Sequence, residues 1–579
     1  MADPIVTVSE RLAPAFAKVA GPGLPIVDPV VRRSDRADAQ VNGSLALAKQ
    51  LGKAPRDVAQ AILDVVELAD ICSAVEIAGP GFVNLTFSNE FLASELGRAA
   101  VDPRLGVRLA TTPIVAVVDY SAPNVAKEMH VGHLRSTVIG DALVRMLSFV
   151  GHRVIRENHI GDWGTPFGML IEHLIDLNDR AAVDGLSMGD LDSFYRQART
   201  KFDSSDLFKD RARERVVLLQ SGDIETLKLW NVLVAESMRH YTSVYDTLGV
   251  LLIESDLKGE STYNHLLPEV VDRLAKRGLL TLSDGAEVVF VTGFVNRENE
   301  PLPLIIRKSD GGFNYATSDL ACVIDRVERL GATLMLYVVG APQAQHLQMV
   351  EAVARQAGWL PSNTQMLHVA FGNVLGTDRK ILKSRSGEVV KLDALLAEAI
   401  ERATTAVEKK NPQLDSVHQR QIARQVGIGA VKYADLSTDR INDYMFDWDR
   451  MLSFDGNTSP YLQYAHARIC SIFRRANVER SHVRTVTPAI GHEAERVLAL
   501  RILQFDTAVW DALEKFSPHR LCTYLHELAT EFSVFYEQCP VLRAESDAQR
   551  ISRLSLCDMT ARVLQSGLLL LGIDAPEQM

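Results

Sequence analysis

The sequence predicts an α/β protein in which a doubly wound parallel sheet lies between an N-terminal α+β domain and a C-terminal all-α bundle. Ile114–Val118 is continuously apolar, as a strand buried on both faces is, and two further short apolar runs follow, Leu334–Val339 and Met366–Phe371. Helical patterns separate them, and this alternation predicts a parallel sheet with crossover helices. Beyond about residue 405, almost every segment has helical spacing, which predicts a bundle.

Residues 1–105 are expected to form the N-terminal domain. Apolar residues from Leu45 to Leu63 recur at helical spacing, and the turn Gly79-Pro80-Gly81 precedes a β-like stretch, Phe82–Phe87. The pattern ends near Pro103. A helix beside a short β segment predicts a small α+β unit.

The central domain is expected to span residues 106–405 and the C-terminal domain residues 406–579. In the first, the apolar run Ile114–Val118 is followed by a loop and a helical pattern from Gly132 to Phe149, which gives strand, loop and helix. In the second, one stripe of large apolar residues has helical spacing: Leu521, Leu525, Leu528, Phe532 and Phe535.

Composition restricts the class of protein. The chain has 579 residues, of which 47% are hydrophobic and 23% charged, as in an ordinary globular protein. Its 62 Lys and Arg against 73 Asp and Glu give a net charge of −11, which argues against an anionic membrane surface as partner. An RNA partner would have to bind a locally basic surface. Six cysteines without any C-x-x-C pair, and no apolar run of membrane-spanning length, predict a soluble cytoplasmic protein.

The densest group of reactive side chains lies between the first strand and the following helix. The segment Ser121–His133 ends in His130-Val131-Gly132-His133, where a helix N-terminus would offer free N–H groups to phosphate. Two imidazoles there would stabilise developing phosphate charge. The alternatives are two ordinary cap or surface histidines, or part of a metal site whose ligand set is incomplete.

His130-Val131-Gly132-His133 resembles the HIGH motif of class I aminoacyl-tRNA synthetases, a family built on a Rossmann-like catalytic domain. The segment Lys380-Ile381-Leu382-Lys383-Ser384 resembles its second motif, the KMSKS loop, with Ile381 and Leu382 departing from the usual residues. Two ammonium groups on a loop suit a pyrophosphate leaving group, although a solvated basic turn is the plain alternative. The resemblance implies that catalysis involves His130, His133, Lys127, Lys380 and Lys383. It implies that ATP is bound by His130, Gly132, His133, Lys380, Lys383 and Ser384.

The wider context resembles the bacterial arginyl-tRNA synthetases over essentially the whole chain. It includes Asn158–Gly164, Lys432–Leu436 and Gly456-Asn457-Thr458. By this resemblance arginine is bound by Asn124, Glu260, Tyr315, Asp319 and Gln343. Two carboxylates suit a planar guanidinium, which is always charged and is best held in bidentate geometry. His159 and Trp163 are expected to support the site.

The same resemblance implies the partners and the domain roles. Arg468–Arg484 holds five arginines against one acid, directly after Tyr461–Tyr464, and is expected to belong to the anticodon-binding domain. The residues expected to bind tRNA are Tyr461, Gln463, Arg468, Arg474 and Arg475, while the N-terminal domain is expected to touch the tRNA elbow. A solvated basic helix face remains the alternative for any one arginine.

The implied reaction activates L-arginine with ATP and Mg²⁺, and then transfers the arginyl group to tRNA(Arg). No protein-ligated metal is expected, and the protein is expected to be a monomer. Three other interpretations stay open: a nucleotidyltransferase that uses the same motif without tRNA, a non-catalytic tRNA-binding relative, and a class I synthetase specific for another amino acid. The first leaves about 170 C-terminal residues unexplained, more than a lone sheet domain needs.

Overall fold

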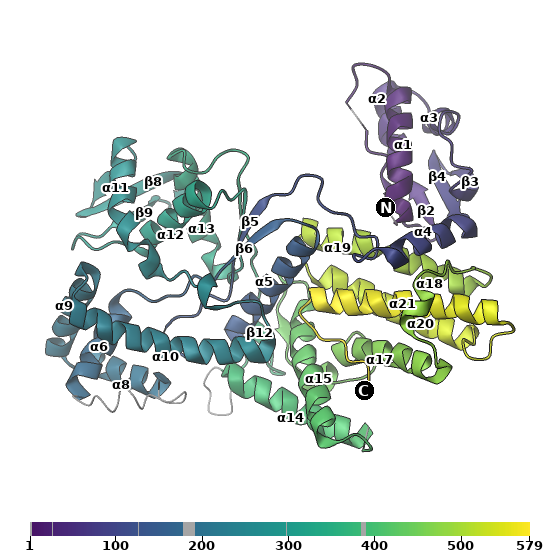
Figure 1. Cartoon of the computed structure of the whole chain (residues 1–579). Helices are drawn as coiled ribbons and strands as arrows, with labels where there is room; N and C mark the ends of the chain where they lie inside the picture. The colour runs from purple at the N-terminus through teal and green to yellow at the C-terminus, as the bar shows by residue number, and fades with distance from the viewer. Residues whose placement is uncertain are drawn as a thin grey trace. The chain divides into compact units, whose positions relative to one another are not determined.

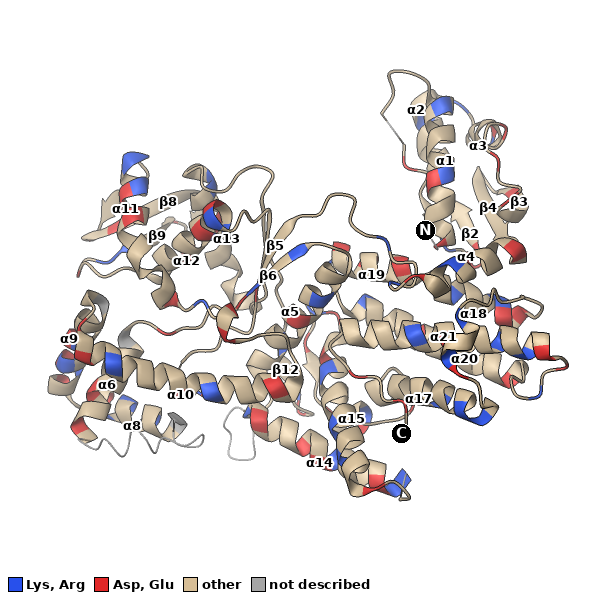
Figure 2. Ribbon diagram, in the orientation of Figure 1, with Lys and Arg blue, Asp and Glu red and all other residues tan. Residues whose placement is uncertain are grey.

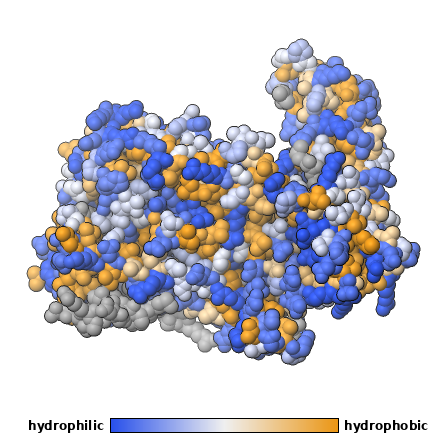
Figure 3. All heavy atoms as spheres, in the orientation of Figure 1, coloured by the Kyte–Doolittle hydropathy of each residue, from blue (hydrophilic) through white to orange (hydrophobic). Residues whose placement is uncertain are grey.

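The computed structural model describes residues 3–25, 27–125, 127–177, 191–296, 298–383, 390–410 and 412–579. The chain forms two compact units (Figure 1). One combines Met1–Leu109 with Ser453–Met579, and the other is Ala110–Leu452. None of the helices in the described ranges is long and apolar enough to cross a membrane. On the face drawn in Figure 3, hydrophobic side chains are interspersed with hydrophilic ones.

The N-terminal part of the first unit is an antiparallel sheet with helices, which confirms the predicted α+β unit. Its strand order is β1-β2-β4-β3. The predicted helix over Leu45–Leu63 is instead two helices, because Gly52 ends the first in a left-handed conformation and Pro55 begins the second. The elements are α1 (Pro4–Ala20), β1 (Val31–Arg32), β2 (Ala39–Val41), α2 (Gly43–Leu51), α3 (Pro55–Leu63), β3 (Cys72–Ala78), β4 (Phe82–Phe87) and α4 (Asn89–Val101).

The C-terminal part of the first unit is helical, as predicted. The apolar stripe from Leu521 to Phe535 is buried along α20. Arg496 of α18 pairs with Asp38 at 2.5 Å and so ties this bundle to the N-terminal sheet within the same unit. The helices are α17 (Ser459–Ala476), α18 (Glu493–Leu503), α19 (Phe505–Glu514), α20 (His519–Gln538) and α21 (Asp547–Leu570).

The second unit is built on a four-stranded parallel sheet with strand order β11-β10-β5-β6, which confirms the predicted doubly wound domain. The strands are β5 (Val115–Asp119), β6 (Arg153–Glu157), β10 (Leu334–Tyr337) and β11 (Gln365–His368). Because β6 follows β5 on one side and β10 pairs with β5 on the other, the winding direction changes between β5 and β10. Ligands of such sheets bind outside the carboxyl ends of the strands at this point.

Helices pack around this sheet and carry the loops of its carboxyl edge. The predicted helix after the first strand is confirmed as α5 (Val131–Phe149), most of whose residues are buried. The chain then returns to β10 and β11 through α12 (Tyr315–Ile324) and α13 (Ala344–Gln356). A π-helical turn, η3 (Asp325–Arg329), extends α12.

Two insertions separate β6 from α12. The first is helical, and the second is an antiparallel sheet of order β7-β8-β9 with α11. Their elements are α6 (Thr165–Leu177), α8 (Leu191–Ser204), α9 (Asp206–Ser221), α10 (Ile224–Leu248), α11 (Leu267–Lys276), β7 (Thr281–Ser283), β8 (Ala286–Val295) and β9 (Pro301–Arg307).

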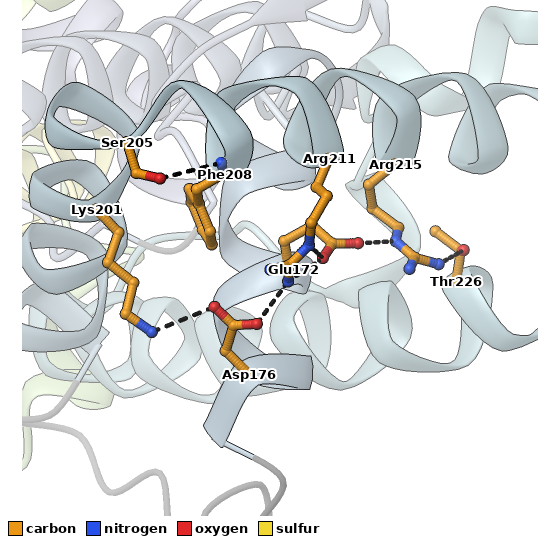
Figure 4. Close-up of polar contacts among 8 residues, drawn as sticks. All are labelled: Glu172, Asp176, Lys201, Ser205, Phe208, Arg211, Arg215 and Thr226. Atoms are coloured by element: carbon orange, nitrogen blue, oxygen red, sulfur yellow. Dashed lines mark hydrogen bonds and ion pairs between the residues drawn. The ribbon is translucent and has the colours of Figure 1, made fainter.

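An ion network holds the helical insertion together. Glu172 on α6 is buried and accepts hydrogen bonds from Arg211 and Arg215 of α9, each at 2.6 Å (Figure 4). Asp176, one turn further along α6, contacts Arg211 at 2.5 Å and Lys201 of α8 at 3.4 Å. Two carboxylates on α6 therefore join three helices.

The second unit extends well past residue 405. The helix α14 (Leu392–Lys410) runs through the expected boundary at 405/406 and packs against α15 (Ser416–Leu436). The short strand β12 (Val374–Leu375) pairs in parallel with β13 (Tyr444–Met445), and α16 (Trp448–Met451) follows. The structure places the end of this compact unit at Leu452 because these elements pack on the sheet domain.

We expect Glu172→Ala to destabilise the helical insertion, since Arg215 loses its carboxylate and Arg211 keeps only Asp176. Removing one partner of a buried ion pair costs about 3 kcal/mol, or roughly a hundredfold faster amide exchange through local opening. Hydrogen exchange over α6 and α9 measures this. As the matched control, Asp203→Ala removes the exposed Arg199–Asp203 pair, whose side chains are 55% and 57% exposed, and should leave the exchange nearly unchanged. Equal effects of the two variants would contradict a special role for Glu172.

Candidate active site

A buried ion triad fixes the carboxyl edge of the sheet. Asp119 ends β5, and Glu157, which lies opposite it in register, ends β6. Arg326 lies between them, donating from Nη2 to Asp119 Oδ2 and from Nε to Glu157 Oε2, both at 2.7 Å. Its guanidinium also lies 4.9 Å from the ring centre of Tyr337 at the end of β10. One arginine therefore joins the ends of three neighbouring strands.

The segment that leaves β5 is held in an unusual backbone conformation. Ser121 and Ala122 have φ values of 74° and 46°, a region that few side-chain-bearing residues adopt. The Ala122 N–H donates to Asn158 Oδ1 at 2.9 Å, and the Ser121 N–H donates to Ser136 Oγ at 2.8 Å. Tyr245 Oη lies within 2.9 Å of both Ser121 Oγ and Asn158 Nδ2. This buried network maintains the strained turn.

The two histidines of the motif lie together at the start of α5, as predicted. His130 is the N-cap residue, and its Nδ1 accepts the Gly132 N–H at 3.0 Å. The His130 N–H in turn donates to Nδ1 of His133 at 3.1 Å, and the ring centres are 4.0 Å apart. Because both Nδ1 atoms accept, each neutral imidazole carries its proton on Nε2.

Burial, reinforced by the neighbouring imidazole of His130, lowers the pKa of His133 to about 3. His133 is therefore neutral at physiological pH. A neutral imidazole with an Nε2 proton donates a hydrogen bond to a phosphate oxygen without adding a full charge.

Asn124 approaches the backbone of the loop after β6. The Val125 N–H donates to the Gly161 carbonyl at 3.0 Å, and the Gly161 N–H donates to the Pro123 carbonyl at 3.2 Å. A Cβ atom on Gly161 would lie 2.4 Å from Asn124 Oδ1. Buried Tyr241 of α10 adds a hydrogen bond to the Asn124 carbonyl at 2.6 Å. The position of the Asn124 side chain thus depends on the missing side chain of Gly161.

Several carboxylates face this edge. Burial raises the pKa of Glu260 to about 7; Asp162 and Asp319 add to the rise, and His159 opposes it. Asp162 accepts from the Ser261 N–H at 2.9 Å, which fixes the turn that carries Glu260. Because burial and neighbouring carboxylates make ionisation of Glu260 costly, a cationic ligand would be favoured here.

The other three residues expected to bind arginine lie on the first turns of two helices. Tyr315 is the first residue of α12, so Tyr315 and Asp319 share one face, as predicted. Gln343 is the N-cap residue of α13, makes no side-chain capping hydrogen bond and is exposed. The side chain of Tyr315 is also exposed.

His159 and Trp163, expected to support the site, pack against other elements of the unit. The His159 N–H donates to Asp119 Oδ1 at 3.3 Å, and its Nδ1 lies 3.8 Å from Cys322 Sγ. Trp163 meets Trp230 of α10 edge to face, with ring centres 6.0 Å apart. The Trp230 indole N–H donates to the Asp162 carbonyl at 2.8 Å.

The lysines of the second motif lie on a turn that follows β12. The Gly376 N–H donates to the Lys380 carbonyl at 2.8 Å, and both Lys380 and Lys383 are exposed. Ser384 lies outside the described residues. Lys127 is also exposed, and its ammonium lies 4.7 Å from the ring centre of Tyr195 of α8.

The chain after this loop returns to the histidine motif. The Val131 N–H donates to the Val390 carbonyl at 3.0 Å, and the Leu392 N–H donates to the Met129 carbonyl at 2.9 Å. Lys391 Nζ lies 2.5 Å from Glu128 Oε2. Sequence reasoning missed this ion pair, because its partners are far apart in the chain.

The residues expected to bind tRNA all lie on α17 of the first unit, and one expectation is corrected. Gln463 is fully buried, and its Nε2 donates to the Asp574 carbonyl at 2.8 Å, so its side chain does not lie on the surface of α17. Its neighbour Tyr464 is exposed instead. Tyr461 and Arg468 are partly exposed. The end of α17 is coloured blue for basic residues in Figure 2, and Arg474 and Arg475 are exposed there.

Of two further arginines in the basic segment, Arg480 is largely buried and Arg484 is exposed. Arg480 pairs with buried Asp558 at 2.7 Å, and Arg484 lies 3.8 Å from the same carboxylate. Within the described ranges, no group of three or more His, Cys, Asp or Glu residues is arranged to hold a metal ion.

Comparisons with known proteins agree with this architecture. The family model "tRNA synthetases class I (R), catalytic domain" matches residues 102–448. The model "Arginyl tRNA synthetase N terminal domain" matches residues 7–87, and "DALR anticodon binding domain" matches residues 462–579.

Individual relatives match over the full length. An arginine–tRNA ligase of Thermobifida fusca is 53% identical over 579 residues, covering 100% of both chains. One from Salmonella typhimurium is 47% identical over 575 residues, covering 99% of both. The arginyl-tRNA synthetase structure from Plasmodium falciparum has a TM-score of 0.84 at 27% identity and covers 99% of each chain. That from Thermus thermophilus has a TM-score of 0.81 at 26% identity, covering 99% of this chain and 100% of its own. The chain therefore belongs to the arginyl-tRNA synthetases, the class I arginine–tRNA ligases.

Proposed function

We propose that the carboxyl edge of the parallel sheet is where this ligase joins ATP, L-arginine and tRNA(Arg). The arginine carboxylate attacks the α-phosphate of ATP and pyrophosphate leaves; a terminal ribose hydroxyl of tRNA then takes the arginyl group and AMP leaves. The observation that supports this most is the pair of imidazoles, His130 and His133, at a helix N-terminus beside the switch point of the sheet.

In this proposal the histidines and lysines of the two motifs contact the phosphates of ATP. His130 and His133 donate to the α-phosphate as charge develops on it, and Gly132 lets adenine approach the backbone. The leaving pyrophosphate is bound by Lys127, Lys380, Lys383 and Ser384. Mg²⁺ arrives on the phosphates of ATP, where it neutralises charge. In-line transfer needs mainly orientation and charge stabilisation, which these groups supply.

Glu260 and Asp319 hold the arginine guanidinium, while Asn124, Tyr315 and Gln343 orient the rest of the amino acid. A guanidinium entering among carboxylates is stabilised by each of them. The cation also restores the ionised form of Glu260, whose pKa of about 7 in the free protein reflects burial. Lysine would lack the planar fork that two carboxylates can grip.

The first unit supplies the tRNA contacts in this proposal. Four residues recur at helical spacing along α17: Tyr461, Tyr464, Arg468 and Arg475. In this proposal the tyrosines stack on bases of the anticodon loop, and the arginines, with Arg474 beside them, neutralise its phosphates. The N-terminal sheet domain would touch the tRNA elbow. We also propose that the protein works as a monomer in the cytoplasm.

The function is tested by ATP–pyrophosphate exchange with each of the twenty amino acids, with and without total tRNA. We expect exchange with arginine alone, and only in the presence of tRNA. Exchange with a different amino acid would contradict the arginine assignment of Glu260 and Asp319. Exchange with none of them would favour a non-catalytic tRNA-binding role.

The KM for arginine should fall as pH rises, because the guanidinium pairs with ionised Glu260. With a pKa of about 7 in the free protein, Glu260 is largely neutral at pH 6 and ionised at pH 8. One proton lost on binding predicts a KM roughly tenfold higher at pH 6 than at pH 8. Steady-state tRNA charging over this range measures it. Glu260→Gln should raise the KM and flatten its pH profile, and an unchanged slope in this variant would assign the proton elsewhere.

Gly161→Ala should weaken arginine binding without unfolding the protein. The new Cβ would lie 2.4 Å from Asn124 Oδ1, so this side chain must move away. Loss of one hydrogen bond predicts a three- to tenfold higher KM for arginine, that is, about 1 kcal/mol. The melting temperature should stay within about 3 °C.

A double-mutant cycle supplies the control for this variant. Once Asn124→Ala has removed the amide, adding Gly161→Ala should have no further effect on the KM. Additive effects would show that Gly161 acts by another route.

A further inference from the structure

A third imidazole, outside the histidine motif, contacts one of the carboxylates proposed to bind arginine. His346 Nε2 lies 2.5 Å from Asp319 Oδ2. The two side chains are 16% and 21% exposed, so the contact is neither in the core nor fully in solvent. The ring of His346 also lies against Tyr315, with centres 4.8 Å apart and an interplanar angle of 59°.

This contact joins the two helices that carry three of the proposed arginine-binding residues. Asp319 and Tyr315 belong to the first turns of α12, and His346 is the third residue of α13. Gln343 is the N-cap residue of the same helix, three residues earlier. His346 thus touches two of these three residues and shares a helix start with the third.

Helix packing does not depend on the contact. The interface of α12 with its surroundings is made by fully buried apolar residues such as Leu320, Ala321 and Val323. Against these, a partly exposed polar pair adds little stability. Its chemical effect is local: it fixes the rotation of the Asp319 carboxylate.

We propose that His346 is a positioning residue for arginine recognition, which holds Asp319 Oδ2 so that the carboxylate is presented to the incoming guanidinium. The inference rests on the proposed assignment of Asp319 to arginine binding. A carboxylate held at one oxygen keeps its other oxygen and remaining lone pairs for the fork of N–H donors. Because the Asp319 carboxylate is already oriented, arginine binding does not have to restrict its rotation, which would cost entropy.

The test compares His346→Ala with His346→Gln in steady-state tRNA charging by the full-length protein. Alanine removes the donor, whereas glutamine keeps an N–H group at similar reach. We expect the KM for arginine to rise roughly tenfold in the alanine variant and less than about threefold in the glutamine variant. The kcat, the KM for ATP and the melting temperature should each stay close to the wild-type values.

His418→Ala is the matched control. Its Nδ1 lies 2.5 Å from Asp415 Oδ2 in an exposed His–Asp pair at the start of α15, away from the site. Removing this pair should leave the KM for arginine unchanged.

Asp319→Asn distinguishes a failure of the positioning role of His346 from a failure of the assignment of Asp319 to arginine binding. If this variant raises the KM for arginine at least tenfold while His346→Ala does not, the positioning role is wrong and the arginine assignment stands. If Asp319→Asn has no effect, the assignment itself fails. A glutamine variant as impaired as the alanine variant, with a lower melting temperature, would show that His346 acts only in packing.

Discussion

The site depends on the burial of two like charges at one edge of a parallel sheet. Parallel strands end at the same edge, so Asp119 and Glu157 are neighbours in register and would repel each other without a cation. Arg326, about 1% exposed, meets both and packs on Tyr337. Because Arg326 belongs to the π-helical turn after α12, the same guanidinium joins that helix to the sheet.

The reactive groups are arranged around this fixed edge. Asp119 accepts the His159 N–H, Asn158 holds the strained turn after β5, and that turn leads to the histidines at the start of α5. The segment after the lysine loop then pairs with Met129 and Val131. These contacts orient the imidazoles of His130 and His133 and the carboxylates of Asp162 and Glu260 before substrate binds. Such orientation in advance is the condition for electrostatic catalysis.

Local pattern was sufficient for most of the fold. Continuous apolar runs predicted three of the four parallel strands, and helical spacing predicted α5 and α20, because these segments are buried and their pattern shows it. The residue at which the sheet domain ends was harder to predict from the sequence. Nothing local marks Leu452 as the end of the sheet domain, since α14 and α15 have the same amphipathic spacing as helices of the bundle.

By itself the sequence determined the fold class, the histidine motif at a helix start and the shared face of Tyr315 and Asp319, since each of these depends on neighbours within a few residues. Only the tertiary structure decided which side chains meet. It buried Gln463 against Asp574, and it brought His346 to Asp319 and Lys391 to Glu128. These pairs are separated by tens to hundreds of residues, and no local pattern encodes them, because packing of distant elements sets the distance between their side chains.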